Sequence, residues 1–230
     1  MPGPVVLGVD VGGQHVKVLR SSGGERRRFD SGSGLTAQQM VDGVTAMTGD
    51  WSYDAVSIGV PAVVREGRVV AEPVNLGKGW VGFDFEASFG HPTKVMNDAA
   101  MQALGSYEGG KMLFLGLGTG LGSALVDDGR VEPMELGHLP FRKATYEDYV
   151  GERARKRHSK KWQEAVLETI GHLTAALEPD YVVLGGGNAK RLDELPPGVR
   201  LGRNDNAFVG AFRLWGAEGA GEEAGGPPHP

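Results

Sequence analysis

Two stretches of this sequence share one pattern, and the repetition constrains the fold more than any other feature. Each has an apolar strand, a glycine-rich turn and a second apolar strand: VVLGVDVGGQHVKVL at residues 5–19 and MLFLGLGTGLGSALV at residues 112–126. Glycine lacks a Cβ and adopts backbone angles that other residues avoid, so it occurs where a turn is tight or where a ligand touches the main chain. The pattern predicts an α/β lobe that occurs twice, with a cleft between the copies.

Helix-like and strand-like segments alternate after each hairpin, and DYVVLGGGNAKR at residues 180–191 is predicted to form a strand, a glycine turn and a helix. Residues 36–47 have helical periodicity with Thr36 as a candidate N-cap, and residues 147–177 form a longer helical stretch that we expect to break near His158. The C-terminal stretch GAEGAGEEAGGPPHP has almost no apolar surface and is expected to be disordered. The resulting division is a first lobe at 1–109, a second lobe at 110–215 whose last helix could pack on the first lobe, and a tail at 216–230.

The composition excludes several classes of protein. The chain has 230 residues, 40% of them hydrophobic, which is enough for two modest cores. It contains no run of about 18 apolar residues and no basic N-terminal region followed by an apolar core, so we expect a cytoplasmic protein without membrane attachment. The absence of cysteine excludes disulfides and thiolate metal sites. A net charge of -5 argues against a nucleic-acid partner.

The glycine turns indicate phosphate binding. Backbone N–H groups in such turns form sites for anions, and two turns that face a common cleft can hold successive phosphates of one donor. Asp10 stands at the end of the strand before the first turn. A carboxylate there could hold a hydrated Mg²⁺ ion that bridges the phosphates, because Mg²⁺ prefers oxygen ligands and retains much of its water.

Two better-known nucleotide-binding motifs do not fit the sequence. Residues 105–112 have the spacing of a Walker A loop, but Met112 replaces the magnesium-binding hydroxyl residue and the segment precedes a strand. A Rossmann fingerprint that starts at Gly116 would need glycine where Leu121 stands and a helix where a strand follows. We therefore exclude a P-loop and a nicotinamide site.

Six short motifs occur in the order found in one family. They are VDVGGQHVK, VNLGKGW, VMNDAA, LGLGTGLGSALV, ELGH and VVLGGG, and they span most of residues 5–215. Together they resemble the ROK sugar kinases of the actin-like ATPase superfamily, in particular the polyphosphate glucokinases. The resemblance implies an α/β fold of two actin-like, ribonuclease H-like lobes with a central cleft. It also implies phosphoryl transfer to a sugar hydroxyl and, as in many actin-like kinases, a homodimer.

The motif VMNDAA matches the catalytic part of the family. Asp98 matches the base that takes the proton from the sugar 6-hydroxyl, and Asn97 beside it matches a sugar ligand. A carboxylate suits this role, because phosphoryl transfer otherwise depends on positioning and on neutralisation of charge. Taken alone, Asp98 could also be an acid in the first turn of a helix, stabilised by the helix dipole. The surrounding motifs favour the catalytic interpretation.

Glu135 and His138 of ELGH match the family's ligands for sugar hydroxyls. A carboxylate accepts from one or two hydroxyls, while an imidazole donates to or accepts from another. Relatives with a zinc site use this histidine together with cysteines, which this chain lacks, so we expect no structural zinc. Glu147 is a further candidate sugar ligand, with a solvated glutamate at a helix start as the alternative. Asn75 stands where the family closes the sugar pocket, whereas we expect nearby Trp80 to be a packing residue.

The phosphate-binding residues implied by the resemblance lie in three glycine turns and beside them. Gln14 departs from the family pattern, because most relatives have serine or threonine there, and the longer glutamine puts the geometry of the donor in question. The turn GGGNAK at 185–190 cradles the nucleotide in ATP-using relatives and persists in polyphosphate enzymes. The full set is Asp10, Gly12, Gly13, Gln14, Lys17, Gly118, Thr119, Gly120, Gly186 and Gly187.

The segment GERARKRHSKKW at 151–162 concentrates positive charge on an acidic protein. On a helix several of these cations would share a face, where they could follow a long phosphate chain. The alternative is a solvated helix surface, which is the commoner explanation of a charge run. The cations are Arg153, Arg155, Lys156, Arg157, Lys160 and Lys161.

The function predicted from the sequence is that of a sugar kinase, specifically a glucokinase that phosphorylates the 6-hydroxyl of glucose. We expect polyphosphate as the first donor and ATP or another nucleotide as the second. A ROK hexose kinase that uses only ATP is one alternative. A non-catalytic sugar sensor is another, because the family includes transcription regulators. These carry an N-terminal helix-turn-helix, which we do not expect here because the first strand is predicted to begin near Val5.

Overall fold

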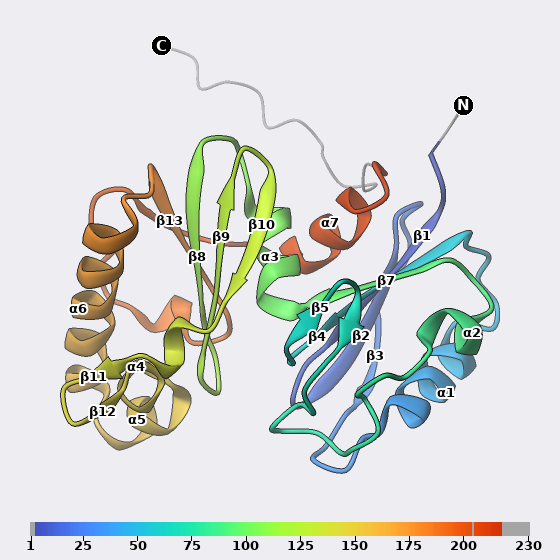
Figure 1. The fold of residues 1–230 in the computed structure, drawn as a ribbon, viewed down its shortest axis with the longest axis horizontal. Coiled ribbons are helices and arrows are strands. Elements are labelled where there is room, and N and C mark those ends of the chain that lie inside the picture. Colours follow the sequence, from blue (N-terminus) through green and yellow to red (C-terminus); the bar gives the residue numbers. More distant parts are fainter. Residues whose placement is uncertain (1–2, 204, 218–230) are drawn as a thin grey trace. The chain divides into compact units, whose positions relative to one another are not determined.

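A computed structural model of the chain describes residues 3–203 and 205–217 (Figure 1). It divides into two compact units, which we call unit 1 and unit 2. Unit 1 comprises the residues up to Asp98 and those from Ala211 on, and unit 2 comprises Ala99–Gly210. The sequence pattern predicts this division at 109/110 and a tail at 216–230. Residues 218–230 of that tail lie outside the described residues.

Unit 1 is built on a five-stranded sheet in the order β3-β2-β1-β4-β7. In this sheet β1 pairs antiparallel with β2 and parallel with β4, while β2 pairs antiparallel with β3 and β4 parallel with β7. The segment between β4 and β7 adds a small hairpin, β5 (Val64–Arg65) and β6 (Arg68–Val69). The strands of the sheet are β1 (Val6–Val11), β2 (His15–Arg20), β3 (Arg27–Asp30), β4 (Ala55–Val60) and β7 (Thr93–Asn97).

Helices α1 (Ala37–Met47) and α2 (Phe85–Phe89) bury apolar side chains against this sheet. Helix α1 begins where the sequence predicts, because Thr36 and Gln39 form a reciprocal capping box in which each side chain accepts the backbone N–H of the other. The expectation that Trp80 is a packing residue is confirmed, since its side chain is fully buried in the same core.

Unit 2 repeats this sheet in the order β10-β9-β8-β13-β14. Strand β8 pairs antiparallel with β9 and parallel with β13, β9 pairs antiparallel with β10, and β13 pairs parallel with β14. The two sheets therefore share strand order and strand direction, as the repeated sequence pattern predicts. The strands are β8 (Lys111–Leu117), β9 (Leu121–Asp127), β10 (Arg130–Met134), β13 (Tyr181–Gly185) and β14 (Val199–Leu201).

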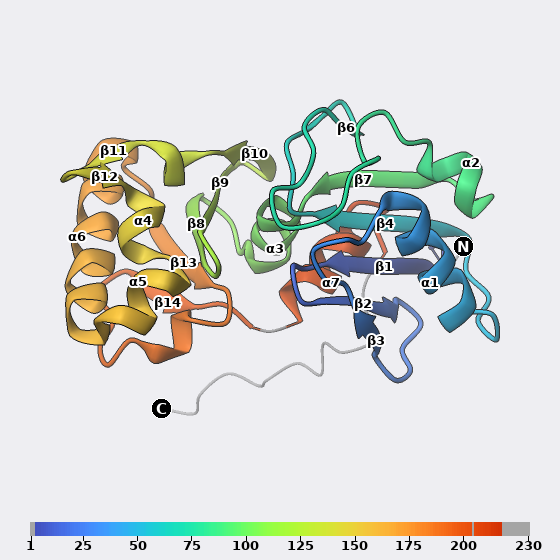
Figure 2. The ribbon, with the colours of Figure 1, turned by 90° about the horizontal axis from the view of Figure 1, so that it is seen from below.

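The long helical stretch of unit 2 is divided into α4 (Tyr146–Val150), α5 (Glu152–Arg157) and α6 (Ser159–Leu177), which pack against one another (Figure 2). The predicted break at His158 is present, and Gly151 adds a second break. Helix α6 buries Trp162, Val166 and Ile170 in the core of the unit.

Shorter elements connect these helices and strands. After β13 the sequence predicts a helix, but only the short 3-10 turn η2 (Ala189–Arg191) forms, and the chain is extended at Leu192. The other short elements are η1 (Leu136–His138), β11 (Pro140–Phe141) and β12 (Ala144–Thr145).

Helices α3 (Asp98–Ser106) and α7 (Asn206–Arg213) contain residues of both units. In unit 2 they meet at two glycines: a Cβ on Gly105 would overlap the carbonyl oxygen of Asn206, and a Cβ on Gly210 would overlap that of Met101. In the part of the chain that the structure describes, no helix has the length and apolar character needed to span a membrane.

Candidate functional site

The carboxyl ends of three parallel strands in unit 1 hold the predicted acidic groups. Asp10 near the end of β1 is in register with Gly59 of β4, and Val60 at the end of β4 is in register with Asn97 of β7. Asp98 follows directly as the first residue of α3. In open α/β sheets this edge is where ligands bind, so the strand order brings Asp10, Asn97 and Asp98 to the edge that a site requires.

Asp10 is buried and already has a cationic neighbour. Its side chain is 12% exposed, and its Oδ2 accepts a hydrogen bond of 3.0 Å from Nζ of Lys17, its cross-strand partner on β2. Across the same edge, Nδ2 of Asn97 donates to the carbonyl oxygen of Ala62 at 3.2 Å, which fixes the amide group beside Asp98. Two of the predicted polar residues are thus held in place before any ligand binds.

The first glycine turn, Gly12–Gln14, is stabilised from within unit 1. The N–H of Gly12 donates to the carbonyl of His15 at 2.9 Å, while Ser31 donates through Oγ to the carbonyl of Gly12 and through its N–H to that of Gln14. Because the Gly12 N–H is used internally, the backbone donors that this turn could offer to a phosphate are those of Gly13 and Gln14. The N–H of Gly12 is not available to a ligand, and a Cβ on Gly12 would lie 3.2 Å from the carbonyl oxygen of His15.

Asn75 lies beside this turn, although about 60 residues separate them in the sequence. Its Cβ is 3.8 Å from the position that a Cβ on Gly13 would occupy, and its side chain is exposed. Nearby, the indole N–H of Trp80 donates to the carbonyl of Leu35 at 3.1 Å. The structure thus brings the candidate sugar residue Asn75 against a candidate phosphate turn within one unit.

In unit 2 the three predicted sugar ligands come together. Nδ1 of His138 lies 3.9 Å from Oε2 of Glu135, and its Nε2 lies 3.7 Å from Oε1 of Glu147. These separations are too long for direct hydrogen bonds. The side chains are 66%, 54% and 40% exposed for His138, Glu135 and Glu147 respectively, so a hydroxylated ligand can reach their polar atoms.

Glu147 also lies against the second glycine turn, Gly118–Gly120. Its Oε2 is only 2.5 Å from the position that a Cβ on Gly120 would occupy, and its Cβ is 3.5 Å from the corresponding position on Gly137. A side chain at position 120 would displace this carboxylate, whereas the tight contact at Gly137 is with the carbonyl oxygen of Leu121, at 2.9 Å from the Cβ position. The Glu147 carboxylate thus lies near both the His138 imidazole and the second glycine turn.

The second turn is supported by two neighbouring segments of unit 2. The N–H of Glu152, at the start of α5, donates to the carbonyl of Gly118 at 2.9 Å, and Nδ2 of Asn188 donates to the same carbonyl at 3.1 Å. A Cβ on Gly186 would overlap the carbonyl oxygen of Leu117, and its φ of 80° also favours glycine. As in the first turn, the leading N–H, that of Gly118, is used internally, here by the carbonyl of Gly120.

Asn188 was not among the residues predicted from the sequence. Its side chain is buried, with 8% exposure, and its backbone N–H also donates to the carbonyl of Leu117 at 3.0 Å. Its position in the sequence could have identified it, because it directly follows the three glycines after the buried strand β13. A buried polar side chain at such a place needs a hydrogen-bond partner. Beside it, a Cβ on Gly187 would have no described atom within 4 Å, so a ligand can approach this glycine.

The basic run is distributed over α5 and α6 rather than over one helix. Glu152 lies 3.0 Å from Nζ of Lys156 and 3.9 Å from Nη2 of Arg155, so these two cations are partly neutralised within α5. Arg155 also has a largely buried side chain, 22% exposed. The cations that remain are Arg153, Arg157, Lys160 and Lys161, and each is exposed.

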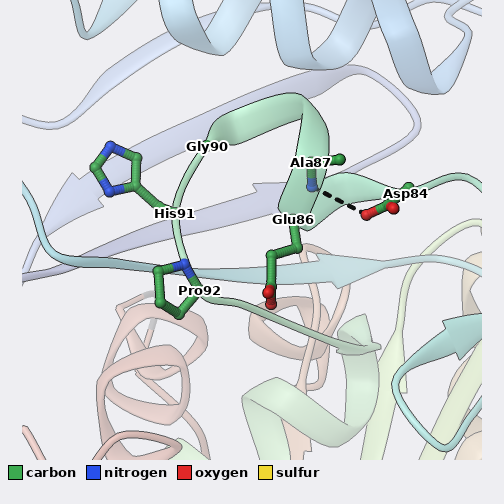
Figure 3. Close-up of a pocket in the computed structure, with 6 residues that line it drawn as sticks. All are labelled: Asp84, Glu86, Ala87, Gly90, His91 and Pro92. Atoms are coloured by element: carbon green, nitrogen blue, oxygen red, sulfur yellow. Dashed lines mark hydrogen bonds between the residues drawn. The ribbon is translucent and has the colours of Figure 1, made fainter.

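A surface recess of about 360 Å³ in unit 1 contains none of the predicted residues. It lies along α2, which Asp84 caps at its start by accepting the N–H of Ala87 at 3.0 Å (Figure 3). Among the described residues, no group of three or more His, Asp or Glu side chains is arranged to hold a metal ion. The residues that line the recess are Asp84, Glu86, Ala87, Gly90, His91 and Pro92.

Known proteins resemble this chain in sequence and in fold. No protein-family model matches the chain. A polyphosphate glucokinase from Mycobacterium tuberculosis is 25% identical over 214 residues, an alignment that covers 83% of this chain and 80% of the relative. The crystal structure of an inorganic polyphosphate/ATP-glucomannokinase from Arthrobacter sp. strain KM matches with a TM-score of 0.76 and 27% identity, over 90% of this chain and 96% of that one. The chain resembles the ROK sugar kinases.

A further solved structure extends the ROK resemblance in fold. The ROK family glucokinase from Streptomyces griseus matches with a TM-score of 0.74 and 17% identity, over 92% of this chain and 99% of that one. The resemblance predicted from the six motifs is confirmed, and so is the α/β fold of actin-like lobes. Both of these structural matches cover the two units of this chain.

Proposed function

We propose that this chain is a hexose kinase that transfers a phosphoryl group to the 6-hydroxyl of glucose. The observation that carries the proposal is the place of Glu147, whose carboxylate lies between the His138 imidazole and the Gly118–Gly120 turn. A sugar held by Glu135, His138 and Glu147 would therefore be next to a turn suited to phosphate. The similarity to polyphosphate glucokinases and to the Arthrobacter glucomannokinase supports the same activity.

The proposed reaction uses Asp98 as the general base. The oxygen of the sugar 6-hydroxyl forms a bond to the terminal phosphorus of the donor, while the bond from that phosphorus to its bridging oxygen breaks. The hydroxyl proton passes to the carboxylate of Asp98, and the bridging oxygen leaves with the shortened polyphosphate or with ADP. Asn97 and Asn75 orient the sugar, and the N–H groups of the glycine turns bind the phosphates.

Magnesium is the cofactor we propose for this reaction. Asp10 fits a hydrated ion and not an enclosed metal site, because one of its oxygens is bonded to Lys17 and no cluster of carboxylates surrounds it within the described residues. Such an ion would bind through water to Asp10, with donor phosphates as its other ligands, and would neutralise their charge. We expect Asp10→Asn to raise the Mg²⁺ concentration needed for half-maximal activity.

Polyphosphate is the donor that we propose first, with ATP second. Helix α5 begins at the second glycine turn, since the N–H of Glu152 donates to the carbonyls of Gly118 and Thr119. A phosphate chain that extends from the turn could therefore continue along Arg153, Arg157, Lys160 and Lys161. ATP has only three phosphates and would not need these cations. A homodimer and a cytoplasmic location remain expectations from the sequence.

The function is tested by a coupled assay for hexose 6-phosphate with glucose, Mg²⁺ and either polyphosphate or ATP. We expect turnover with polyphosphate. The donor proposal is tested by the triple variant Arg157→Gln, Lys160→Gln, Lys161→Gln, which should raise the KM for polyphosphate and leave that for ATP unchanged. A triple variant of the exposed residues Arg65, Arg68 and Arg130 to Gln removes the same charge elsewhere and is the matched control.

Three outcomes would count against parts of this proposal. Equal effects of the two triple variants would show that the basic run is a solvated surface. Turnover with ATP alone would leave a ROK-type hexose kinase that does not use polyphosphate. Binding of glucose without turnover on either donor would replace the kinase with a sugar-binding protein.

A further inference from the structure

The loop that carries Asn75, residues 72–81, is closed by one glutamate. Oε1 of Glu72 accepts the N–H of Gly79 at 3.1 Å, and its Oε2 accepts the N–H of Trp80 at 3.1 Å. The two ends of the loop are thus joined by a carboxylate that binds two successive backbone donors. Hydrogen bonds to a charged group are roughly twice as strong as those between neutral groups.

The charge state of Glu72 agrees with this role. The N–H of Trp80 lowers the pKa of the Glu72 carboxyl below its usual range, partly opposed by burial and aided by the N–H groups of Gly79 and Val81. The carboxylate is therefore ionised at neutral pH, which is the form that accepts both bonds.

The same loop is fixed on its inner side to the segment that precedes α1. The N–H of Gly77 donates to the carbonyl of Leu35 at 3.0 Å, and a Cβ on Gly77 would overlap the carbonyl oxygen of Gly34. Leu76 and Trp80 are buried beside it. With its inner residues anchored and its ends closed, the loop has little freedom at the exposed residue between them, Asn75.

We propose that Glu72 is a positioning residue that holds Asn75 against the first glycine turn, Gly12–Gln14. Asn75 lies with its Cβ 3.8 Å from the Cβ position of Gly13, and Glu72 acts on it through the loop without touching a substrate. The inference rests on the proposed function in one respect, the assignment of Asn75 to the sugar. Its consequence is that Glu72 determines how tightly the hexose binds.

The test compares Glu72→Ala and Glu72→Gln with the matched control Glu86→Ala. Glu86, whose side chain is drawn in Figure 3, is also exposed. Its Oε2 accepts the N–H of Thr93 at 3.2 Å, seven residues along the chain, just as Glu72 accepts that of Gly79. Two quantities are measured: hydrogen exchange of the Gly79 and Trp80 amides by NMR, and the kcat and KM for glucose.

We expect Glu72→Ala to accelerate exchange at both amides and to raise the KM for glucose about tenfold with kcat nearly unchanged, as for a lost binding interaction. Glu72→Gln keeps one acceptor oxygen and should give an intermediate KM. The control variant should change neither quantity.

Two results would overturn the proposal, and they differ from a failure of the proposed function. Faster exchange with an unchanged KM would show that the loop is closed by Glu72 but does not position Asn75. Unchanged exchange would show that Glu72 does not close the loop. A wild-type protein that phosphorylates no hexose would refute the proposed kinase activity. In that case the glucose affinity of the same variants, measured by calorimetry, tests the positioning role. That role is refuted if glucose does not bind, or if it binds all variants equally.

Discussion

The two glycine turns occupy the same place in two sheets of the same topology, yet their surroundings differ in chemistry. Before the first turn, the cross-strand pair is Asp10 and Lys17, two charged residues joined at 3.0 Å. At the matching place before the second turn, the pair is Gly116 and Gly122, which have no side chains. The repeated topology sets where a turn lies, whereas the residues beside it set what the turn can bind.

The supports of the turns differ in the same way. The first turn is held by hydrogen bonds from Ser31. The nearest atom to a Cβ on Gly13 is the Cβ of Asn75, at an ordinary contact distance of 3.8 Å. The second turn is packed on the backbone of its neighbours, with Gly151 and Asn188 in direct contact. We therefore expect the second turn to tolerate substitution less well than the first, and the following predictions test this difference.

The largest effect is expected for Gly151→Ala compared with Gly13→Ala. A Cβ on Gly151 would lie 2.5 Å from the carbonyl oxygen of Thr119 and 2.7 Å from that of Glu147, and backbone atoms cannot move aside easily. We expect a loss of about 3 kcal/mol in the free energy of unfolding, measured by urea denaturation. Gly13→Ala should cost less than about 0.5 kcal/mol, because the nearest atom to its Cβ is 3.8 Å away.

Activity separates the two variants further. The Cβ position of Gly13 faces Asn75, the proposed sugar residue, and its N–H is a proposed phosphate donor. We therefore expect Gly13→Ala to lose turnover while it keeps its stability. If Gly13→Ala unfolds as readily as Gly151→Ala, the proposed difference between the turns is wrong.

A smaller effect is expected when one hydrogen bond to each turn is removed. Asn188→Ala deletes the buried donor to the Gly118 carbonyl and should cost about 2 kcal/mol. Ser31→Ala deletes the donor to the Gly12 carbonyl at a part-buried position and should cost about 1 kcal/mol. Thermal unfolding of both variants checks the order, and a larger loss for Ser31→Ala would contradict it.

The smallest effect concerns exposed carboxylates in each unit. In unit 1 the hydrogen-bonded Arg27 guanidinium lowers the pKa of Asp50 to about 2, and in unit 2 the Thr145 hydroxyl and N–H lower the pKa of Asp148. A carboxyl whose pKa is lower in the folded state stabilises that state at a pH above the pKa of the unfolded state. This stabilisation is lost as the pH falls through the pKa of the folded state. For Asp50 this window lies between its ordinary value of 3.8 and about 2.

Because the Asp50 pair is exposed, its removal should change stability little at neutral pH. An NMR titration of the Asp50 carboxyl should give a pKa near 2, and Arg27→Gln should return it toward 3.8. A value that stays low without Arg27 would assign the shift to another group.

The sequence predicts the fold well where patterns are local. The repeated strand, turn and strand, the Thr36 cap and the break at His158 all follow from residues close together in the chain, and the structure contains each of them. The helix expected after Gly187 forms only a 3-10 turn, since the chain is already extended at Leu192.

The candidate site is predicted less completely, because its supports come from distant segments. Glu135, His138 and Glu147 are identified by motif, and the structure brings them together. Asn188 and Glu72 are not, because their partners are backbone groups that a motif does not display. The sequence predicts that several cations of the basic run share a helix face, but it does not show that Glu152 pairs with Lys156 and lies near Arg155.

The central claim is that Asp98 is the base of a hexose kinase. The most direct measurement is the kcat of Asp98→Asn with glucose and the preferred donor, together with the affinity for glucose by calorimetry. We predict that kcat falls by about 100-fold or more, with glucose affinity nearly unchanged, because the amide cannot accept the hydroxyl proton. A variant that keeps about a tenth or more of the wild-type kcat would contradict the claim and leave Asp98 as an acid that only stabilises the start of α3.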